Sequence, residues 1–344
     1  MNKTVVLGLS GGVDSAVAAC LLKEQGYAVH GRWLDIGLGG REDAEAVAAR
    51  CGIPFSAGDI RKELEEQVME PFRREYLAGR TPMPCARCNP AVKFPALFRC
   101  AQAVGAEFVA TGHYAQILPG ENGEATLCRG AHTNDQAYML ARLPRDWLPR
   151  LLFPIGGLEK EAVRRLARQY GLPVADKADS MEICFIPQGD YAAWLESRGE
   201  TPPPGDFVDE TGAVLGRHKG IHHYTIGQRR GLSIPAAHRL FVSDICPADN
   251  TVLLSDGTDL MADTVWGEDL NLLAELETGA EVTVRLRHSK VETPARFVRT
   301  EEGGRADLLT PARAPTPGQL AVFYQGDRVL GSMWITAAHR VTQD

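Results

Sequence analysis

The feature that most constrains this chain is an apolar strand pattern that runs directly into a glycine-rich turn. Residues 4–9 read TVVLGL, and Ser10-Gly11-Gly12-Val13-Asp14-Ser15 follows before a helical pattern begins at Ala16. An uninterrupted β-branched and aliphatic run predicts a strand covered on both faces. Glycines at a strand-to-helix turn let backbone N–H groups converge on an anion in front of the helix N-terminus. The segment is therefore either a phosphate-binding loop or a plain turn capped by Ser and Asp.

The residue types in this loop narrow its chemistry. The loop is neither a Walker A loop, which ends in Lys followed by Ser or Thr, nor a G-x-G-x-x-G dinucleotide fingerprint. The hydroxyls of Ser10 and Ser15 can bind phosphate oxygens, and the Asp14 carboxylate can hold Mg²⁺ on a departing pyrophosphate. We therefore expect Asp14 to be the metal-holding residue of this loop.

Strand and helix patterns alternate after the loop. In chain order they lie at residues 28–34, 41–50, 53–55, 61–77, 92–104 and 108–111. This alternation predicts an α/β domain with a parallel sheet flanked by helices. A small hairpin is predicted around Glu121-Asn122-Gly123, and helices at 160–170 and 191–197 extend the same domain.

The chain is long enough for more than one core. Its 344 residues are about twice a typical domain. Thr201-Pro202-Pro203-Pro204-Gly205 cannot continue a helix or a central strand, so a boundary is expected there. Short alternating runs between turn residues then predict β-rich modules, with a second split near Asp263 to Glu268. The expected domains are 1–200, 205–263 and 264–344.

Charge and hydropathy exclude several classes of protein. The net charge of −7 excludes a protein that coats nucleic acid through overall positive charge, so any nucleic-acid site has to be local. Such a patch is predicted between Thr211 and Ser243, which contains Arg, Lys and His but no Asp or Glu. No stretch reaches the roughly 18 apolar residues of a membrane span, and the first residues do not resemble a signal peptide. We expect a cytoplasmic protein without a membrane partner.

Three of the eight cysteines lie outside periodic segments, where chemistry is expected. Cys85 and Cys88 flank Arg87 in a proline-rich loop, and Cys184 lies in a second loop. A cysteine beside Arg or at a helix start has a lowered pKa, which predicts reactive thiolates. Either the three bind zinc or an iron–sulfur cluster, or Cys88 and Cys184 form a redox pair that passes sulfur. The others are predicted to be core residues: Cys20, Cys51, Cys100, Cys128 and Cys246.

Four separated motifs carry a family resemblance. SGGVDS resembles the loop of the PP-loop ATP pyrophosphatases, which adenylate a carbonyl or carboxylate oxygen. With the two cysteine segments and the 221–232 segment IHHYTIGQRRGL, the sequence resembles the tRNA-specific 2-thiouridylases over nearly its whole length. The resemblance implies an N-terminal PP-loop (adenine-nucleotide α-hydrolase-like) domain, a small β-rich central domain and a C-terminal β-barrel-like domain. It also implies ATP-dependent 2-thiolation of the wobble uridine of tRNA.

The resemblance further implies a role for individual residues. Cys184 would carry a persulfide, and Cys88 would be the nucleophile that releases the sulfur and ends in a disulfide with Cys184. ATP and Mg²⁺ would be the cofactors, and tRNA and a sulfur donor, a cysteine desulfurase or a persulfide relay protein, the partners. ATP would contact Gly8, Leu9, Ser10, Gly11, Gly12, Val13, Asp14 and Ser15, with Leu34 and Gly112 beside the adenine and ribose. The tRNA would contact Met83, Pro84, Cys85, His113, Asn134, Asp135, Gln136, Arg285 and Gln319, the first three of them at the target base.

The sequence departs from this family at three places, one of which is a shorter segment after Leu34. Cys85 occupies the position of an Asp that has been viewed as an acid/base group, and Leu286 replaces a Tyr that follows Arg285 in relatives. The loss of this Tyr removes a stacking ring, which contributes roughly 1–3 kcal/mol per base in other systems. Three alternatives stay open: an iron–sulfur-dependent thiolase that uses Cys85, Cys88 and Cys184, another PP-loop adenylating ligase, and a tRNA-binding module without catalysis.

Overall fold

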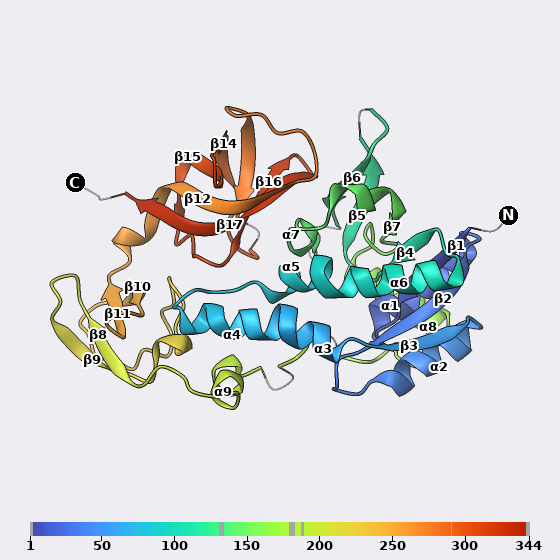
Figure 1. Ribbon diagram of the computed structural model, residues 1–344, viewed down its shortest axis with the longest axis horizontal. Helices are drawn as coiled ribbons and strands as arrows, with labels where there is room; N and C mark the ends of the chain where they lie inside the picture. The colour runs from blue at the N-terminus through green and yellow to red at the C-terminus, as the bar shows by residue number, and fades with distance from the viewer. Residues whose placement is uncertain are drawn as a thin grey trace.

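The computed structural model describes residues 3–120, 122–130, 134–178, 183–186, 189–289 and 291–341. It has an N-terminal α/β domain, a small central β domain and a C-terminal barrel (Figure 1). Within the described part of the chain, no helix is long and apolar enough to cross a membrane. Glu121, in the predicted hairpin turn, and residues 179–182 of the Cys184 segment lie outside the described residues.

The N-terminal domain is built on a five-stranded, fully parallel sheet. In sheet order its strands are β3 (Phe55–Asp59), β2 (Ala28–Asp35), β1 (Thr4–Gly8), β4 (Phe108–Ala110) and β7 (Leu151–Leu152). The helices α1 (Val13–Glu24), α2 (Arg41–Cys51) and α8 (Lys160–Gln169) share one core with Val5 and Leu7 of β1. On the other face Val6 packs with α6 (Phe94–Val104). The predicted central strand, buried on both sides, is confirmed.

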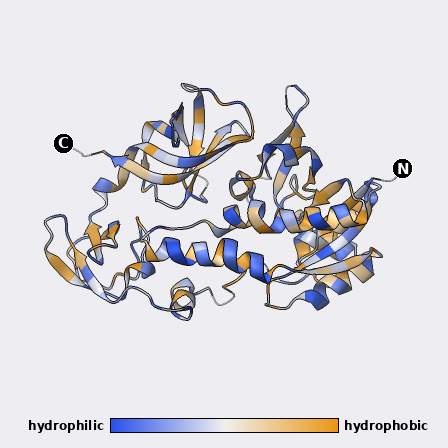
Figure 2. Ribbon diagram, in the orientation of Figure 1, coloured by the Kyte–Doolittle hydropathy of each residue, from blue (hydrophilic) through white to orange (hydrophobic). Residues whose placement is uncertain are grey.

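Two helices expected to be continuous are interrupted by π-turns. The predicted helix at 61–77 is divided into α3 (Arg61–Leu64), η1 (Glu65–Met69) and α4 (Glu70–Leu77). The helix expected from Val92 is preceded by α5 (Pro84–Cys88) and η2 (Asn89–Lys93), and α6 follows. Pro71 and Pro95, just after each π-turn, have no N–H for the i→i−4 bond of an α-helix. Figure 2 shows that α4 carries hydrophilic and hydrophobic residues; Phe72 and Tyr76 are among the buried ones.

The central domain is a four-stranded sheet with a small apolar core. Its order is β10 (Phe241–Cys246), β11 (Thr251–Ser255), β8 (Gly205–Val208) and β9 (Val214–His218). Phe207, Val242 and Val252 are fully buried between its strands and the 221–234 segment. Short helices flank this domain: α9 (Tyr191–Glu196), η4 (Ile221–His223) and η5 (Thr258–Leu260).

The C-terminal domain is a closed six-stranded antiparallel barrel. Its strands are β12 (Met261–Leu272), β15 (Gly303–Arg313), β14 (Thr293–Arg299), β13 (Glu281–Arg285), β16 (Leu320–Gln325) and β17 (Arg328–Arg340). Pairing of β12 with β17 closes it. The expected split at Asp263 to Glu268 falls inside β12, which already pairs with β15 at Met261, so the chain enters the barrel slightly earlier than the turn residues indicated.

The predicted hairpin near residue 122 exists and joins the two larger domains. It consists of β5 (Ala115–Pro119) and β6 (Ala125–Arg129), and Cys128 of β6 pairs with Arg328 of β17. The short helices α7 (Ala137–Leu140) and η3 (Arg145–Arg150) follow it. Residues of α6, α7 and β16 share one apolar core, so the N-terminal domain and the barrel are packed together.

Candidate active site

The SGGVDS loop closes on itself at the carboxyl end of β1. The Ser10 N–H donates to the Ser15 hydroxyl (3.2 Å), and that hydroxyl lies 3.1 Å from the Gly12 carbonyl, to which it donates. Gly11 has φ +75°, and a Cβ there would lie 2.9 Å from the Cβ of Asp43. A Cβ at Gly112 would lie 2.8 Å from the Ser15 nitrogen, so the segment after β4 packs tightly on the start of α1. The loop is therefore held compactly in front of α1, where a phosphate would be expected.

Two lysines far away in the sequence converge on this loop. Lys160, the first residue of α8, donates to both carboxylate oxygens of Asp14 at 2.8 and 2.9 Å, and the Tyr114 hydroxyl donates to the same carboxylate at 2.7 Å. Lys177 donates to the Gly11 carbonyl (3.2 Å) and to Asp43 (2.5 Å). The sequence analysis missed both, because neither lies in a motif. Their ammonium groups give the loop the positive charge that its sequence lacks.

The other residues expected at ATP lie along the same sheet edge. Leu34, near the end of β2, contacts two apolar cores, and Gly112 lies two residues after the end of β4. Carboxyl ends of adjacent parallel strands form the ligand crevice in open α/β sheets. The structure therefore brings Leu34, Gly112 and the SGGVDS loop to one edge.

Cys85 and Cys88 are both on α5, and their surroundings correct one expectation. Burial raises the pKa of the Cys85 thiol, and it raises the pKa of the Cys88 thiol to about 11. Arg87 does not counter this effect, because its guanidinium lies 5.6 Å from the ring centroid of Trp334. The predicted lowering of these pKa values by Arg87 or by the helix start is wrong: both thiols are protonated at neutral pH.

Lys93 is the cation that acts on these cysteines. It ends the π-turn η2; its positive charge lowers the pKa of Cys85 and of Cys88, and its backbone N–H bonds to the Cys88 thiol. The same charge, after burial, helps to hold the pKa of His113 well below its usual range, so the imidazole is neutral. A π-turn often marks a functional site, but an i+5 lysine was not a pattern that the sequence analysis considered.

We expect Lys93→Met to slow alkylation of Cys88 at pH 8. Loss of the ammonium raises the pKa of the thiol further, and each unit lowers the thiolate fraction about tenfold. The measurement is the rate of iodoacetamide labelling at Cys88 against pH, read by peptide mass spectrometry. Lys62→Met, at an exposed lysine on α3, is the matched control, and Lys93→Arg is expected to restore labelling. An unchanged pH profile in Lys93→Met contradicts the assignment.

Cys184 is exposed and close to the other two thiols. A negative charge on Cys184 raises the pKa of both Cys85 and Cys88. All eight cysteines are free thiols, so Cys88 and Cys184 are not bonded to each other here. Among the described residues, one group of three possible metal ligands has its ligand atoms within 4.8 Å of one another, and it consists of Glu196, His222 and His223. The sulfurs of Cys85, Cys88 and Cys184 therefore do not meet this distance for a metal or cluster site. The five remaining cysteines are buried or half-buried, as expected of core residues.

Several residues expected at tRNA lie inside the protein and join its parts. Arg285 is 4% exposed and donates to Asp135 at 2.6 Å. The Gln136 side chain accepts a hydrogen bond from the Tyr114 N–H (3.0 Å), and Tyr114 in turn binds Asp14. Asn134 precedes this pair and is half-buried. This segment therefore links the barrel to the nucleotide loop; whether it also contacts tRNA stays a prediction.

His113 has a similar internal position. It is 9% exposed, its Nδ1 lies 2.7 Å from the Thr111 hydroxyl, and its ring lies 6.2 Å from that of Phe94 at the start of α6. His113 therefore lies between Gly112, at the nucleotide edge of the sheet, and Lys93, next to the two cysteines of α5.

Gln319 attaches the cysteine loop to the barrel. Its side-chain amide donates to the carbonyls of Thr81 (2.9 Å) and Pro82 (3.3 Å), and the Thr81 N–H donates to the Pro317 carbonyl at 2.9 Å. A Cβ at Gly318 would lie 2.9 Å from the Thr81 carbonyl oxygen. The segment that leads into Met83, Pro84 and Cys85 is thereby fixed by the turn that precedes β16 of the barrel.

We expect Gln319→Ala to loosen this attachment. Two hydrogen bonds of about 0.5–1.5 kcal/mol each are lost, which predicts roughly tenfold faster hydrogen exchange at the Thr81 amide. Exchange followed by mass spectrometry of the 78–88 segment measures this. Gln325→Ala, at an exposed residue that ends β16, is the control. Equal protection in both variants refutes the role of Gln319.

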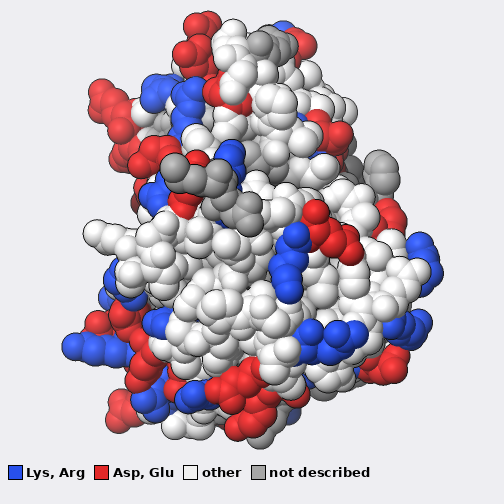
Figure 3. Space-filling model, turned by 90° about the vertical axis from the view of Figure 1, so that its right-hand side faces the viewer, with Lys and Arg blue, Asp and Glu red and all other residues white. Residues whose placement is uncertain are grey.

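The predicted basic patch is only partly at the surface. Lys219, Arg229, Arg230 and Arg239 are exposed, whereas His218 and His222 are buried. Burial lowers the pKa of both these histidines, so they carry no charge at neutral pH. Figure 3 shows the opposite end of the molecule, at the N-terminal domain, where Lys and Arg side chains alternate with Asp and Glu around a broad uncharged area. The exposed arginines of the 229–239 segment are therefore the residues of the patch that can bind a polyanion.

Comparisons with known proteins cover the whole architecture. Three family models match consecutive parts: "tRNA methyl transferase HUP domain" at residues 3–188, "tRNA methyl transferase PRC-barrel domain" at 193–256 and "Aminomethyltransferase beta-barrel domain" at 262–335. The predicted α/β domain followed by two β-rich domains is confirmed.

Curated relatives of full length carry one name. The protein "tRNA-specific 2-thiouridylase MnmA" of Acidithiobacillus ferrooxidans is 42% identical over 346 residues, which cover 97% of this chain and 98% of the relative. Its namesake in Lachnoclostridium phytofermentans is 42% identical, with 96% and 98% covered, and that of Carboxydothermus hydrogenoformans is 41% identical, with 96% of each covered.

Solved structures give more distant likenesses. A 4-thiouridine synthetase in complex with RNA and ATP is 18% identical, with a TM-score of 0.35 over 57% of this chain and 50% of that one. An NMN synthetase from Francisella tularensis is 21% identical, with a TM-score of 0.32 over 52% of this chain and 67% of that one. At these scores the likenesses carry no argument about function.

Proposed function

Because this chain belongs to the family of tRNA-specific 2-thiouridylases, an ATP-dependent PP-loop family that thiolates tRNA, we propose that it thiolates the wobble uridine through Cys184 and Cys88. The observation that supports this assignment best is the arrangement around Lys93 and His113. The loop that suits ATP phosphates and the α5 cysteines lie on the two sides of these residues. An activated base between the two sides would be within reach of both.

The nucleotide side performs the activation. ATP transfers its adenylyl group to the uracil C2 oxygen and releases pyrophosphate, so that the oxygen can later leave as part of AMP. Backbone N–H groups of the SGGVDS loop, with Lys160 and Lys177, would bind the phosphates. The Asp14 side chain is 32% exposed on this loop, and with phosphate oxygens it offers the ligands that Mg²⁺ prefers. Mg²⁺ held there would neutralise charge on the departing pyrophosphate.

The cysteine side supplies sulfur. A cysteine desulfurase or relay protein would load the exposed Cys184 as a persulfide, and its terminal sulfur would attack C2, with AMP leaving. The Cys88 thiolate then attacks the Cys184 sulfur, which forms a Cys88–Cys184 disulfide and leaves the thiolated base. An external thiol reduces this disulfide with two electrons. A cytoplasmic location agrees with this need for reductant.

Lys93 determines when Cys88 is nucleophilic. Burial keeps the thiol protonated, whereas the Lys93 ammonium and backbone N–H favour the thiolate. This balance protects Cys88 from solution chemistry and still permits attack inside the site. Cys85, with a raised pKa, would act as a neutral thiol beside the base.

The test is thiolation by the purified protein. It is incubated with ATP, Mg²⁺, a persulfide source and unmodified bulk tRNA, and the digested RNA is analysed for 2-thiouridine by mass spectrometry. ATP-dependent 2-thiouridine from colourless protein supports the proposal. Product only from protein that absorbs near 400 nm would favour an iron–sulfur thiolase instead. Pyrophosphate release with a small carboxylate rather than tRNA would favour another adenylating ligase.

A further inference from the structure

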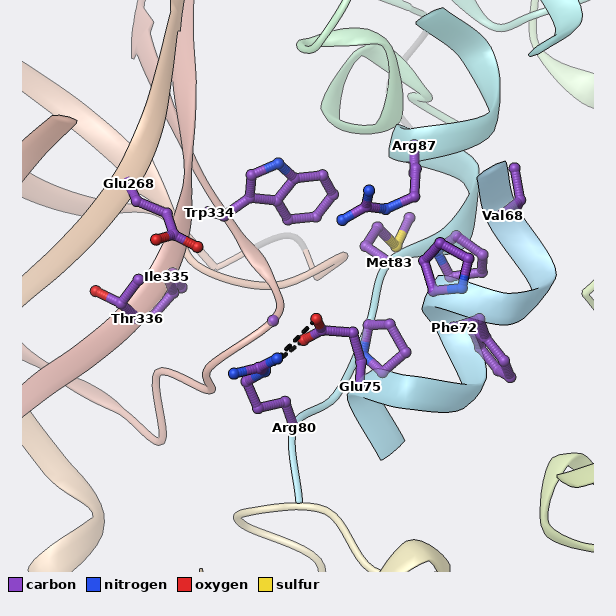
Figure 4. A pocket seen from close by; sticks show the side chains of 14 residues that line it. Val68, Phe72, Glu75, Arg80, Met83, Arg87, Glu268, Trp334, Ile335 and Thr336 are labelled. Atoms are coloured by element: carbon purple, nitrogen blue, oxygen red, sulfur yellow. Dashed lines mark hydrogen bonds and ion pairs between the residues drawn. The ribbon is translucent and has the colours of Figure 1, made fainter. Parts of the chain in front are cut away.

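A pocket lies between the N-terminal domain and the barrel, beside the loop that carries Met83. It is lined by residues of η1, α4 and α5 on one side and of β12 and β17 on the other. Figure 4 shows Trp334 of β17 and Arg87 of α5 at one end and the Glu75–Arg80 pair at the other. Of the residues expected at the target base, Met83 and Pro84 line it, and its other walls have no role in the proposed sulfur transfer.

The walls combine an aromatic face with both kinds of hydrogen-bonding group. Trp334 is half-buried, with Arg87 at 5.6 Å and Arg142 at 5.7 Å from its ring centroid. The Arg80 guanidinium binds the Glu75 carboxylate through two hydrogen bonds, at 2.5 and 2.9 Å. The guanidinium groups of Arg87 and Arg142 lie over the Trp334 ring, which brings together the aromatic and arginine groups on which bases stack. Carboxylate acceptors and guanidinium donors suit the edge of a base that carries N–H and C=O groups.

The position of the pocket points to one occupant. Met83 lines it and belongs to the segment expected at the target base, so the pocket is continuous with the proposed tRNA site. Leu286, which follows Arg285, is 7% exposed and packs in the barrel core, so it offers no surface for a base. Trp334, on the same barrel, offers a ring at the domain junction.

We propose that this pocket binds an unpaired nucleobase of the tRNA, a neighbour of the target uridine, stacked on Trp334. The inference rests on the proposed function, because it assumes that the target uridine lies beside Met83. A paired base cannot stack there, since its faces are covered by its helix, so the ligand belongs to a single-stranded loop. Arg87 at the rim supplies positive charge for the adjoining phosphate.

A thermodynamic cycle tests the proposal. Binding of a synthetic anticodon stem-loop is measured for the wild type and Trp334→Leu, with each loop nucleotide in turn made abasic. We expect Trp334→Leu to weaken binding of the intact stem-loop roughly 5- to 100-fold. We expect that removal of one base other than the target weakens binding to the wild type by a similar factor. Removal of the same base is expected to have little further effect on binding to Trp334→Leu. Trp334→Phe is expected to lie between the two.

Trp266→Leu is the matched control, because Trp266 is a 36% exposed tryptophan on β12 of the same barrel and does not line the pocket. Thermal melting verifies that each variant is folded. If Trp334→Leu binds normally, or if its loss is independent of every abasic position, the pocket does not hold a base. Wild-type thiolation of the intact stem-loop is measured in parallel. Its absence would refute the proposed function, whereas thiolation without coupling refutes the pocket alone.

Discussion

Replacement of Cys184 by Ser is expected to abolish formation of 2-thiouridine while adenylation of tRNA continues. Cys184 is exposed, as a sulfur acceptor must be, and it is close enough to Cys88 to influence its pKa. A hydroxyl cannot carry a persulfide, so we expect a loss on the order of 10³-fold or more, as for removal of a nucleophile. Mass spectrometry of digested tRNA measures the product, and a pyrophosphate assay measures activation.

The control for this variant is Cys246→Ser, at a half-buried cysteine in the central domain that the proposed reaction does not use. It is expected to retain both activities. If Cys184→Ser still forms 2-thiouridine, or if a folded variant loses pyrophosphate release as well, Cys184 does not carry the sulfur.

Replacement of Asp14 by Asn is expected to block the step before sulfur transfer. Its carboxylate accepts hydrogen bonds from the Lys160 ammonium and the Tyr114 hydroxyl. It is also the expected Mg²⁺ ligand of the loop. Asparagine keeps the shape of the side chain but lacks the negative charge that attracts the Lys160 ammonium and Mg²⁺. We expect tRNA-dependent pyrophosphate release to fall about 10²- to 10³-fold, which is roughly 3–4 kcal/mol in the barrier.

Asp59→Asn is the control for Asp14→Asn. Asp59 also forms an ion pair, which is exposed, with Arg61 at 2.5 Å, and it ends the edge strand β3, two strands away from β1. Normal pyrophosphate release is expected in this variant. Equal rates in the two variants would remove Asp14 from the activation step, and a shift of Asp14→Asn activity to higher Mg²⁺ concentration would support its role as a ligand.

The sequence by itself determined the features that depend on neighbouring residues. The TVVLGL run is a buried strand because its Val and Leu side chains are apolar, and the turn after it requires a glycine at Gly11, where a Cβ would lie 2.9 Å from the Cβ of Asp43. The parallel sheet and the β-rich second half followed from hydrophobic periodicity and turn residues. Cys88 and Cys184 were singled out because both were expected in loops, although the structure places Cys88 at the end of the short helix α5.

Only the tertiary structure decided which groups act on these motifs. Lys160 and Lys177 reach the phosphate loop from about 150 residues away, and Gln319 holds the Thr81 segment from another domain. Arg87, the cation next to Cys88 in sequence, turns to Trp334, whereas Lys93 is brought to the thiol by a π-turn. Charge interactions and burial depend on distance in space, which local patterns do not encode. For that reason the sequence could single out the candidate cysteines, while the folded chain determined the protonation of Cys85 and Cys88.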